Sequence, residues 1–143
     1  SGGLLQDLML SGEMGVSPKI NGAETLPFLF LLGGRSALDF WSLSPGLINL
    51  IELKSSIFSF IVAGGLSRPV YLHNQLFLSL GAFSGFKYSQ GNLNWCIIPR
   101  LEYGSYITNE LFLISSWQLN ILTDQELSNA EVQILIGLGW QIL

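Results

Sequence analysis

The segment Glu131–Ile142 reads EVQILIGLGWQI, and its alternation decides the fold class. Every second residue from Val132 onward is large and apolar, whereas the residues between them include Gln133 and Gly137. Successive side chains of a β-strand point to opposite faces, so this spacing predicts a strand with one apolar and one polar face. A helix would instead place its apolar residues three and four positions apart.

The same period of two recurs along most of the chain. It is present in the segments 8–17, 26–40, 76–88, 95–107 and 111–121. One face of each segment is formed by aliphatic and aromatic residues, and the other is rich in Gly, Ser, Asn, Gln and a few charged residues. Turn-forming pairs such as Asn21-Gly22 and Thr108-Asn109 separate the segments. The chain is therefore predicted to be all-β.

The connections favour an antiparallel up-and-down barrel. Short connections at 73–74 and 108–109 alternate with longer ones at 89–93 and 123–130, as in barrels with tight turns at one rim and loops at the other. A membrane-spanning strand needs about 9–11 residues, so a chain of this length accommodates roughly eight strands, and about ten are possible. The whole chain, 1–143, is expected to form a single domain.

The least regular stretch lies between Gly34 and Ser56. Ser44-Pro45-Gly46 interrupts the alternation there, so one strand is expected without a fixed register. Gly64-Gly65 is expected to mark a bulge or a bend in the strand that follows.

The composition excludes several classes of protein. Charged residues make up 11% of the chain and hydrophobic residues 49%, which excludes intrinsic disorder. Six cations against ten anions, with a formal net charge of -4, argue against a nucleic-acid partner. The apolar windows 26–32 and 57–66 are too short for a membrane-spanning helix, which needs about 18 consecutive apolar residues.

The scarcity of charge also indicates which face points inward. A soluble lipid-carrying barrel has its apolar face inside and many charges in contact with water, whereas a membrane barrel has an apolar band outside and a polar lumen. Aromatic residues fall near the expected strand ends, as interfacial girdles require, at Tyr71, Tyr88, Trp95 and Trp140. A transmembrane β-barrel is therefore predicted, with a soluble barrel or sandwich as the alternative.

The polar faces carry charges of both signs, and these are the candidate site residues. The predicted lumen polar network contains Glu13, Arg35, Asp39, Lys87, Arg100 and Glu102. Mixed signs suit a narrow lumen in which buried charges must pair. The network is expected to be an ion-pair cluster that fills the barrel, or alternatively a polar relay or small-ligand contact. Because side chains fill the interior of an eight-stranded barrel, a wide pore is disfavoured.

The same faces suggest two more specific arrangements, a carboxylate pair and a thiol beside Arg100. Asp39 could form a paired-carboxylate site with Glu13 or with Asp7, and Arg35 is then available to neutralise it. Cys96 shares the inward face with Arg100, and an inert buried side chain is expected for it rather than a reactive thiol.

Several segments resemble small bacterial outer-membrane barrels. The resemblance rests on Asn74–Phe83, on Pro99–Tyr103 with the following Thr108–Leu113, and on Ile136–Gly137–Leu138–Gly139–Trp140. The resemblance extends over 57–143. The class that these segments resemble includes OmpA-type transmembrane domains and lipid A deacylase (PagL-like) barrels. The resemblance implies insertion in the bacterial outer membrane.

The last strand departs from the family pattern. Its members usually end on a lipid-facing aromatic residue, which signals the assembly machinery, whereas Ile142 holds that register here and Leu143 follows. Insertion by that machinery is an expectation that the resemblance implies. The Ser1-Gly2-Gly3 start is compatible with a removed signal peptide or with none.

Catalytic groups are scarce. Deacylase-like barrels use a His and a Ser two positions apart on a late strand, whereas Trp117–Ile121 contains no base. The single histidine, His73, falls in an expected short turn, and a serine nucleophile needs an adjacent base. The acidic loop 123–131 could bind a cation or a partner, although a solvated loop is the simpler expectation. No cofactor and no metal site are expected.

The leading hypothesis is an integral outer-membrane β-barrel with a structural, anchoring or surface-interaction role. Membrane lipid is its expected partner, and a protein partner could bind through the loops. The alternatives are a lipid-modifying enzyme similar to lipid A deacylase and a soluble barrel that binds a hydrophobic ligand.

Overall fold

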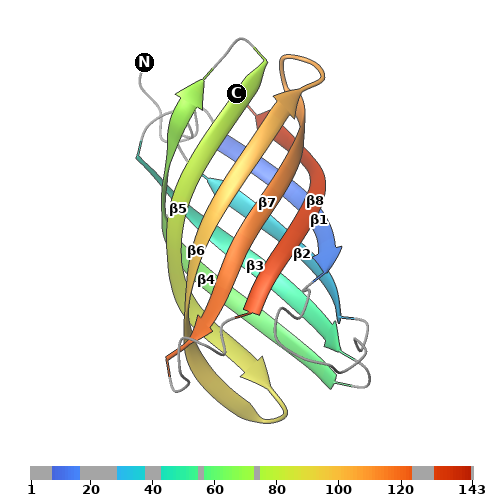
Figure 1. The fold of residues 1–143 in the computed structure, drawn as a ribbon, viewed down its shortest axis with the longest axis vertical. Helices are drawn as coiled ribbons and strands as arrows, with labels where there is room; N and C mark the ends of the chain where they lie inside the picture. The colour runs from blue at the N-terminus through green and yellow to red at the C-terminus, as the bar shows by residue number, and fades with distance from the viewer. Residues whose placement is uncertain are drawn as a thin grey trace.

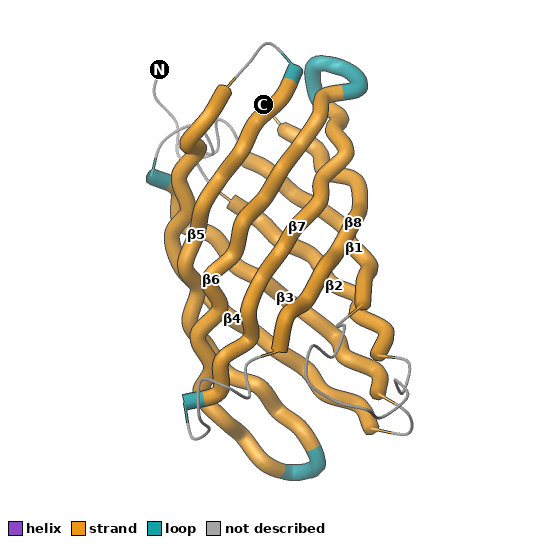
Figure 2. The backbone as a smooth tube through the Cα atoms, in the orientation of Figure 1, coloured by secondary structure: helices purple, strands orange, loops and turns teal. Residues whose placement is uncertain are grey.

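The computed structural model describes residues 8–16, 29–37, 43–54, 57–72, 75–123 and 131–142. They form eight antiparallel strands that close into a barrel, each strand pairing with the next and β8 with β1 (Figure 1, Figure 2). The strands are β1 (Leu8–Val16), β2 (Leu29–Ala37), β3 (Ser44–Lys54), β4 (Ile57–Leu72), β5 (Leu76–Ser89), β6 (Asn92–Tyr106), β7 (Leu111–Leu122) and β8 (Glu131–Ile142). The predicted all-β fold class and strand count are confirmed.

The barrel has two unlike rims. β1 begins and β8 ends at the same rim, since Leu8 lies opposite Ile142; we call it the terminal rim, and the other the loop rim (Figure 1). The β4–β5 and β6–β7 connections lie at the terminal rim, and the β5–β6 and β7–β8 connections at the loop rim. The β5–β6 hairpin extends beyond its neighbours at the loop rim (Figure 2).

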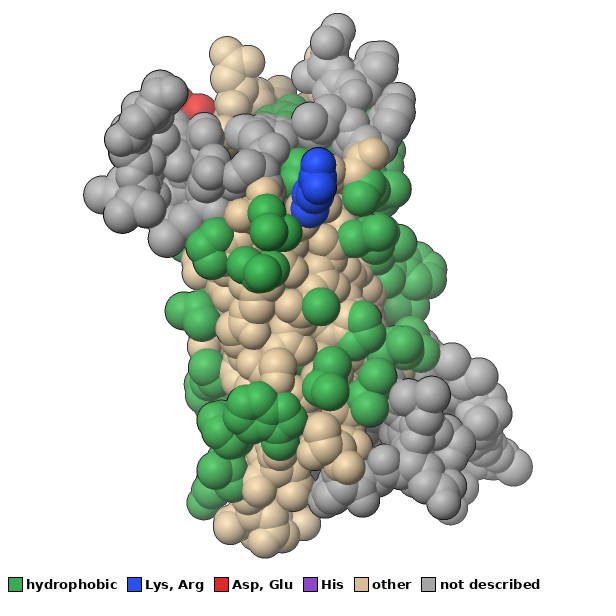
Figure 3. Space-filling view, turned by 90° about the vertical axis from the view of Figure 1, so that its left-hand side faces the viewer, with side chains coloured by type: hydrophobic (Ala, Val, Ile, Leu, Met, Phe, Trp, Pro, Cys, Tyr) green, Lys and Arg blue, Asp and Glu red, His purple; other side chains and the backbone are tan. Residues whose placement is uncertain are grey.

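The predicted alternation is clearest in β7. Leu113, Trp117 and Leu119 are exposed on the outer wall, whereas Ile114 and Gln118 are buried inside. On the face drawn in Figure 3, hydrophobic side chains are spread over the barrel wall, and the charged side chains that appear lie toward one end. Among the described residues, no helix is long and apolar enough to cross a membrane.

β3 explains the irregular stretch in the sequence. The strand begins at Ser44 itself, and Pro45 is its second residue, where a proline is tolerated. Its inward face carries Ile48 and Leu50, both fully buried, while Leu47 on the outer face is exposed. Because both faces are apolar, the period of two is hidden in this strand.

Two expectations about irregular backbone were wrong. The stretch 89–93 is not a longer loop: β5 and β6 are joined by the two residues Gln90 and Gly91, both with positive φ (51° and 82°), as tight hairpin turns require. The irregularity of β4 lies between Pro69 and Tyr71, not at Gly64-Gly65. Proline removes a backbone donor, which explains the shift there.

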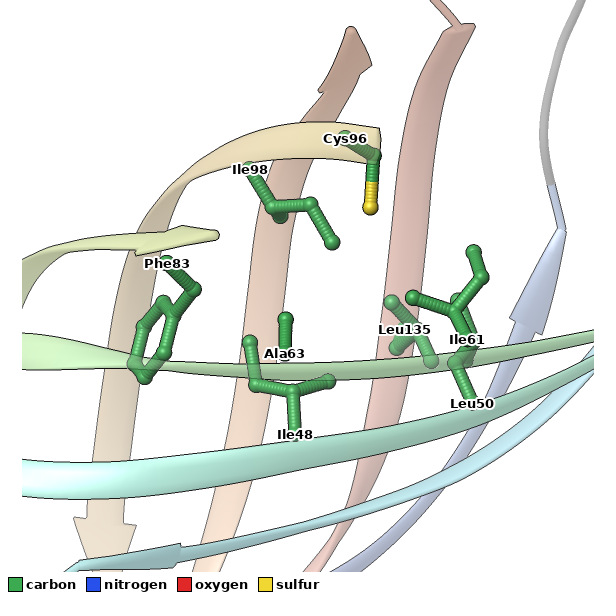
Figure 4. Packing of buried hydrophobic residues seen from close by; sticks show 8 residues of the cluster. All are labelled: Ile48, Leu50, Ile61, Ala63, Phe83, Cys96, Ile98 and Leu135. Carbon is green, nitrogen blue, oxygen red and sulfur yellow. The ribbon is translucent and has the colours of Figure 1, made fainter. Parts of the chain in front are cut away.

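Two apolar clusters lie inside the barrel. The larger one joins β3 to β6 and β8 (Figure 4) and consists of Ile48, Leu50, Ile61, Ala63, Phe83, Cys96, Ile98 and Leu135. The smaller one contains Met9, Phe77, Phe112 and Ile114, and the rings of Phe77 and Phe112 meet edge to face with centroids 5.2 Å apart. Because Met9, Phe77 and Phe112 stand near strand ends, the smaller cluster fills the lumen toward the terminal rim.

Candidate functional site: the lumen network

Arg100 is the centre of a buried polar cluster. Its Nη2 donates to both carboxylate oxygens of Glu13, at 2.8 and 2.6 Å, and its Nε donates to Glu102 at 3.1 Å. Its Nη1 donates to Gln118 Oε1 and its Nη2 to Ser116 Oγ, each at 2.8 Å. The Arg100 residue is only 4% exposed, so this charge is neutralised by protein groups rather than by water.

Glu13 reaches Arg100 from the far side of the barrel. Its strand partners are Gly33 on β2 and Gly137 on β8. A Cβ at position 137 would collide with the Gly12 carbonyl and with the Glu13 Cα, so glycine permits the close approach of β1 and β8 there. The hydroxyls of Ser11 and Ser116 also donate to the Glu13 carboxylate.

A second ion pair lies closer to the loop rim. Lys87 Nζ is 2.9 Å from Glu52 Oε2, and Gln133 Nε2 donates to Glu52 Oε1 at 2.6 Å. Gln118 Nε2 donates to Gln133 Oε1 at 2.7 Å, which joins this pair to the Arg100 cluster. The result is one continuous lumen network that consists of Ser11, Glu13, Glu52, Lys87, Arg100, Glu102, Ser116, Gln118 and Gln133.

The structure brings four of the six proposed site residues into this network. Glu13, Arg100 and Glu102 form one ion-pair cluster, and Lys87 belongs to the other. Arg35 lies opposite Ser11 in the β1–β2 register, but its side chain is outside the described part of the structure.

Several other expectations fall on residues outside the described ranges. Asp7 and Asp39, proposed as carboxylate partners of Glu13, are among them, as are His73 and most of the acidic loop 123–131. For Glu13 itself, the charged partner seen among the described residues is Arg100.

Glu52 was not among the predicted site residues, and neither were Gln118 and Gln133. Glu52 stands on β3, where apolar inward neighbours conceal the alternation. Alternation places Gln118 and Gln133 on polar faces, but the sequence alone does not show that their amides meet. A cross-strand register could have found them, because Gln118 lies directly opposite both Arg100 and Gln133.

A few buried polar atoms have no hydrogen-bond partner among the described residues. They are both amide atoms of Asn120 and the hydroxyl of Ser79, and Asn120 is only 2% exposed. An unpaired buried amide costs about 1–3 kcal/mol. Ser79 and Asn120 are therefore weak points of the lumen.

The arrangement is suited to holding strands together, because its bonds join side chains from different strands. Within the described ranges, no group of three or more His, Cys, Asp or Glu side chains could hold a metal ion. Cys96 is a free thiol buried in the larger apolar cluster. The lumen network and the two apolar clusters occupy the interior with buried side chains.

Comparisons with known proteins support the same architecture. No protein-family model matches the chain, and a search of curated proteins finds no match. Among solved structures, Neisserial surface protein A (NspA) matches with a TM-score of 0.68 and 9% identity, over 94% of this chain and 97% of that one. The chain has the fold of small outer-membrane β-barrels.

Two further structures extend the comparison. The N-terminal β-barrel domain of Pseudomonas aeruginosa OprF matches with a TM-score of 0.63 and 12% identity, over 96% of this chain and 98% of that one. A de novo designed transmembrane β-barrel matches with a TM-score of 0.61 and 15% identity, over 95% of each chain. Since a designed sequence reaches the same fold, the fold alone assigns no activity.

Proposed function

We propose that the chain is an integral β-barrel of the bacterial outer membrane with a structural, anchoring or surface-interaction role. The observation that carries the proposal is the combination of an apolar outer wall with a lumen closed by ion pairs. Outward residues such as Leu113, Trp117 and Leu119 are exposed, and large contiguous apolar surfaces of this kind mark contact with a membrane or a partner. A soluble ligand-binding barrel would need these apolar faces inside.

The positions of the aromatic residues support a bilayer span. Tyr88 and Trp95 are exposed near the loop rim, and Tyr103 and Trp140 are exposed near the terminal rim. We assign these two groups to the two interfaces of the membrane, where amphipathic rings are favoured. Trp117 lies midway along β7 and would face hydrocarbon.

A closed lumen argues for a role on the membrane surface rather than transport. Arg100, Glu13 and Glu102 are each at most 4% exposed, and the Phe77–Phe112 pair adds an apolar layer. NspA is named a surface protein, and the OprF structure is the β-barrel domain of a larger protein. These neighbours make display of loops or anchoring the favoured roles.

Electrophoresis with and without boiling in SDS tests membrane-barrel behaviour. The folded barrel should migrate differently from the boiled chain, and it should need detergent to stay dispersed. Absence of a heat-dependent shift, together with solubility without detergent, would contradict the proposal. In planar bilayers the same protein should give no large, stable conductance steps.

Epitope insertion tests the surface role. An epitope placed in the β7–β8 connection, at the loop rim, should be labelled by antibody on intact bacterial cells, because longer loops face outward in such barrels. The matched control carries the epitope in the β6–β7 connection, within 107–110 at the terminal rim. If only the control is labelled, the barrel has the opposite orientation, with the terminal rim outside the cell. If neither is labelled, the surface role loses its support.

A further inference from the structure

Pro99 occupies an unusual place in the barrel. Among the described strand prolines, Pro45 is the second residue of its strand and Pro69 adjoins a register shift. Pro99 instead lies at the middle of β6, in a closed wall without an edge. Proline is normally confined to edges, strand ends and bulges because it has no N–H to donate.

The pairing of β6 with β7 is interrupted at this proline. Ile97 pairs with Ile121 and Arg100 with Gln118 in one unbroken register, but the two positions between them, including Pro99 opposite Leu119, are unpaired. The register does not shift across the interruption, so no bulge accommodates the proline.

The interruption leaves one backbone acceptor without its donor. Thr123 N donates to Trp95 O, and Ile107 N donates to Leu111 O. Odd-numbered residues of β6 therefore turn their N–H and C=O groups toward β7, because these groups alternate along a strand. An N–H at position 99 would bond the Leu119 carbonyl, and proline supplies none.

An apolar groove lies on the outer wall over this point. Its volume is about 330 Å³. Leu80, Leu101 and Trp117 are exposed around it. The residues that line it on the outer wall are Leu80, Pro99, Leu101, Trp117, Leu119 and Val132. We call it the Pro99 groove.

We propose that the Pro99 groove binds an acyl chain that carries a mid-chain hydroxyl group, with the hydroxyl donating to the Leu119 carbonyl. The inference rests on the proposed insertion in a membrane. In hydrocarbon, an unsatisfied carbonyl finds no water, so a donor on the lipid itself has an advantage. A plain chain fills the same groove but leaves the carbonyl unbonded.

The barrel offers an internal control. A second apolar groove, of about 550 Å³, lies on the outer wall around Gly12 and is bordered by Met14, Ile136 and Trp140. The β1–β2 and β1–β8 ladders pair without interruption there. The Gly12 groove should therefore accept acyl chains with no preference for a hydroxyl.

Tryptophan quenching can compare the two grooves. The chain has four tryptophans, so one variant retains only Trp117 and another only Trp140, with the others changed to Phe. Each is reconstituted in phosphatidylcholine vesicles whose acyl chains carry bromine at mid-chain, which quenches nearby indoles. Phosphatidylcholine with either a plain or a mid-chain-hydroxylated acyl chain is then added as competitor.

The hydroxylated competitor should relieve quenching of Trp117 about fivefold more effectively than the plain one, the ratio expected for one net hydrogen bond. At Trp140 the two competitors should be equal. Pro99→Ala restores an N–H at position 99, so the preference at Trp117 should disappear, and the new amide should be protected from hydrogen exchange. Leu80→Phe, made in the Trp117 reporter, narrows the groove without touching the ladder and should weaken both competitors.

Equal competition at Trp117, or a hydroxyl preference that survives Pro99→Ala, would overturn the inference. These results leave membrane insertion intact as long as bromine quenches both tryptophans. If neither Trp117 nor Trp140 is quenched in vesicles, the proposed membrane span itself fails.

Discussion

At the scale of single residues, Arg100 is the centre of the lumen network. Its guanidinium bonds to Glu13, Glu102, Ser116 and Gln118, which come from three different strands. A planar group with several fixed donors can do this, whereas a lysine ammonium presents a single point charge. The side chain therefore couples opposite walls of the barrel.

Arg100→Met should be strongly destabilising. It leaves two buried carboxylates without their cation, and breaking such a pair from one side costs about 3–5 kcal/mol. Urea unfolding in detergent micelles measures the loss. Arg68→Met, which removes an exposed cation on β4, should change stability by no more than about 0.5 kcal/mol. Equal losses in the two variants would contradict the role given to Arg100.

Asn120 and Gln118 make a second residue-scale comparison, since both are buried amides on β7. Asn120→Leu removes two atoms that have no partner in the described part of the chain, and it should stabilise the barrel by about 1 kcal/mol. Gln118→Leu removes bonds to Arg100 and Gln133 and should destabilise it by at least about as much. The same unfolding assay measures both, and destabilisation of equal size by the two changes would be the contrary result.

At the scale of elements, the β5–β6 hairpin depends on its turn. Gly91→Ala should cost about 1 kcal/mol because φ is +82° at that position, although a Cβ would meet no atom within 4 Å. Gly12→Ala is the matched control, since a Cβ at Gly12 also meets nothing within 4 Å and φ there is not positive. A cost at Gly12 that equals the cost at Gly91 would show that backbone conformation is not the cause.

The strands differ in how well the sequence alone predicts them. β7 and β8 could be predicted because one face is apolar and the other polar, which produces the period of two. β3 could not be placed, because Ile48 and Leu50 turn inward and make both faces apolar. The β5–β6 turn was expected to be longer, although Gly91 itself indicated a turn.

The candidate site was predictable to a similar extent. Alternation shows that Arg100 and Glu102 share a face, because they are two residues apart on one strand. It does not show that Glu13 meets Arg100, since that contact joins residues 87 positions apart. Barrel closure and cross-strand register create it, and neither is encoded in local periodicity.

At the scale of the whole molecule, the barrel has an apolar outside and an inside filled by ion pairs and apolar side chains. Within the described ranges, the lumen holds the charged side chains of Glu13, Glu52, Lys87, Arg100 and Glu102, where hydrocarbon does not reach them. Closure removes every sheet edge, so each strand finds partners on both sides. These two features together favour insertion in a bilayer.

Nitroxide scanning of β7 in phospholipid vesicles tests that claim most directly. In a Cys96→Ala background, single cysteines replace Leu113, Trp117 and Leu119 on the outer wall, and Thr123 at the loop rim. At the three wall positions, collisions with dissolved oxygen should exceed those with a water-soluble nickel chelate, and the order should reverse at position 123. Nickel collisions that dominate at all four positions would mean that the apolar wall faces water, which would contradict the account.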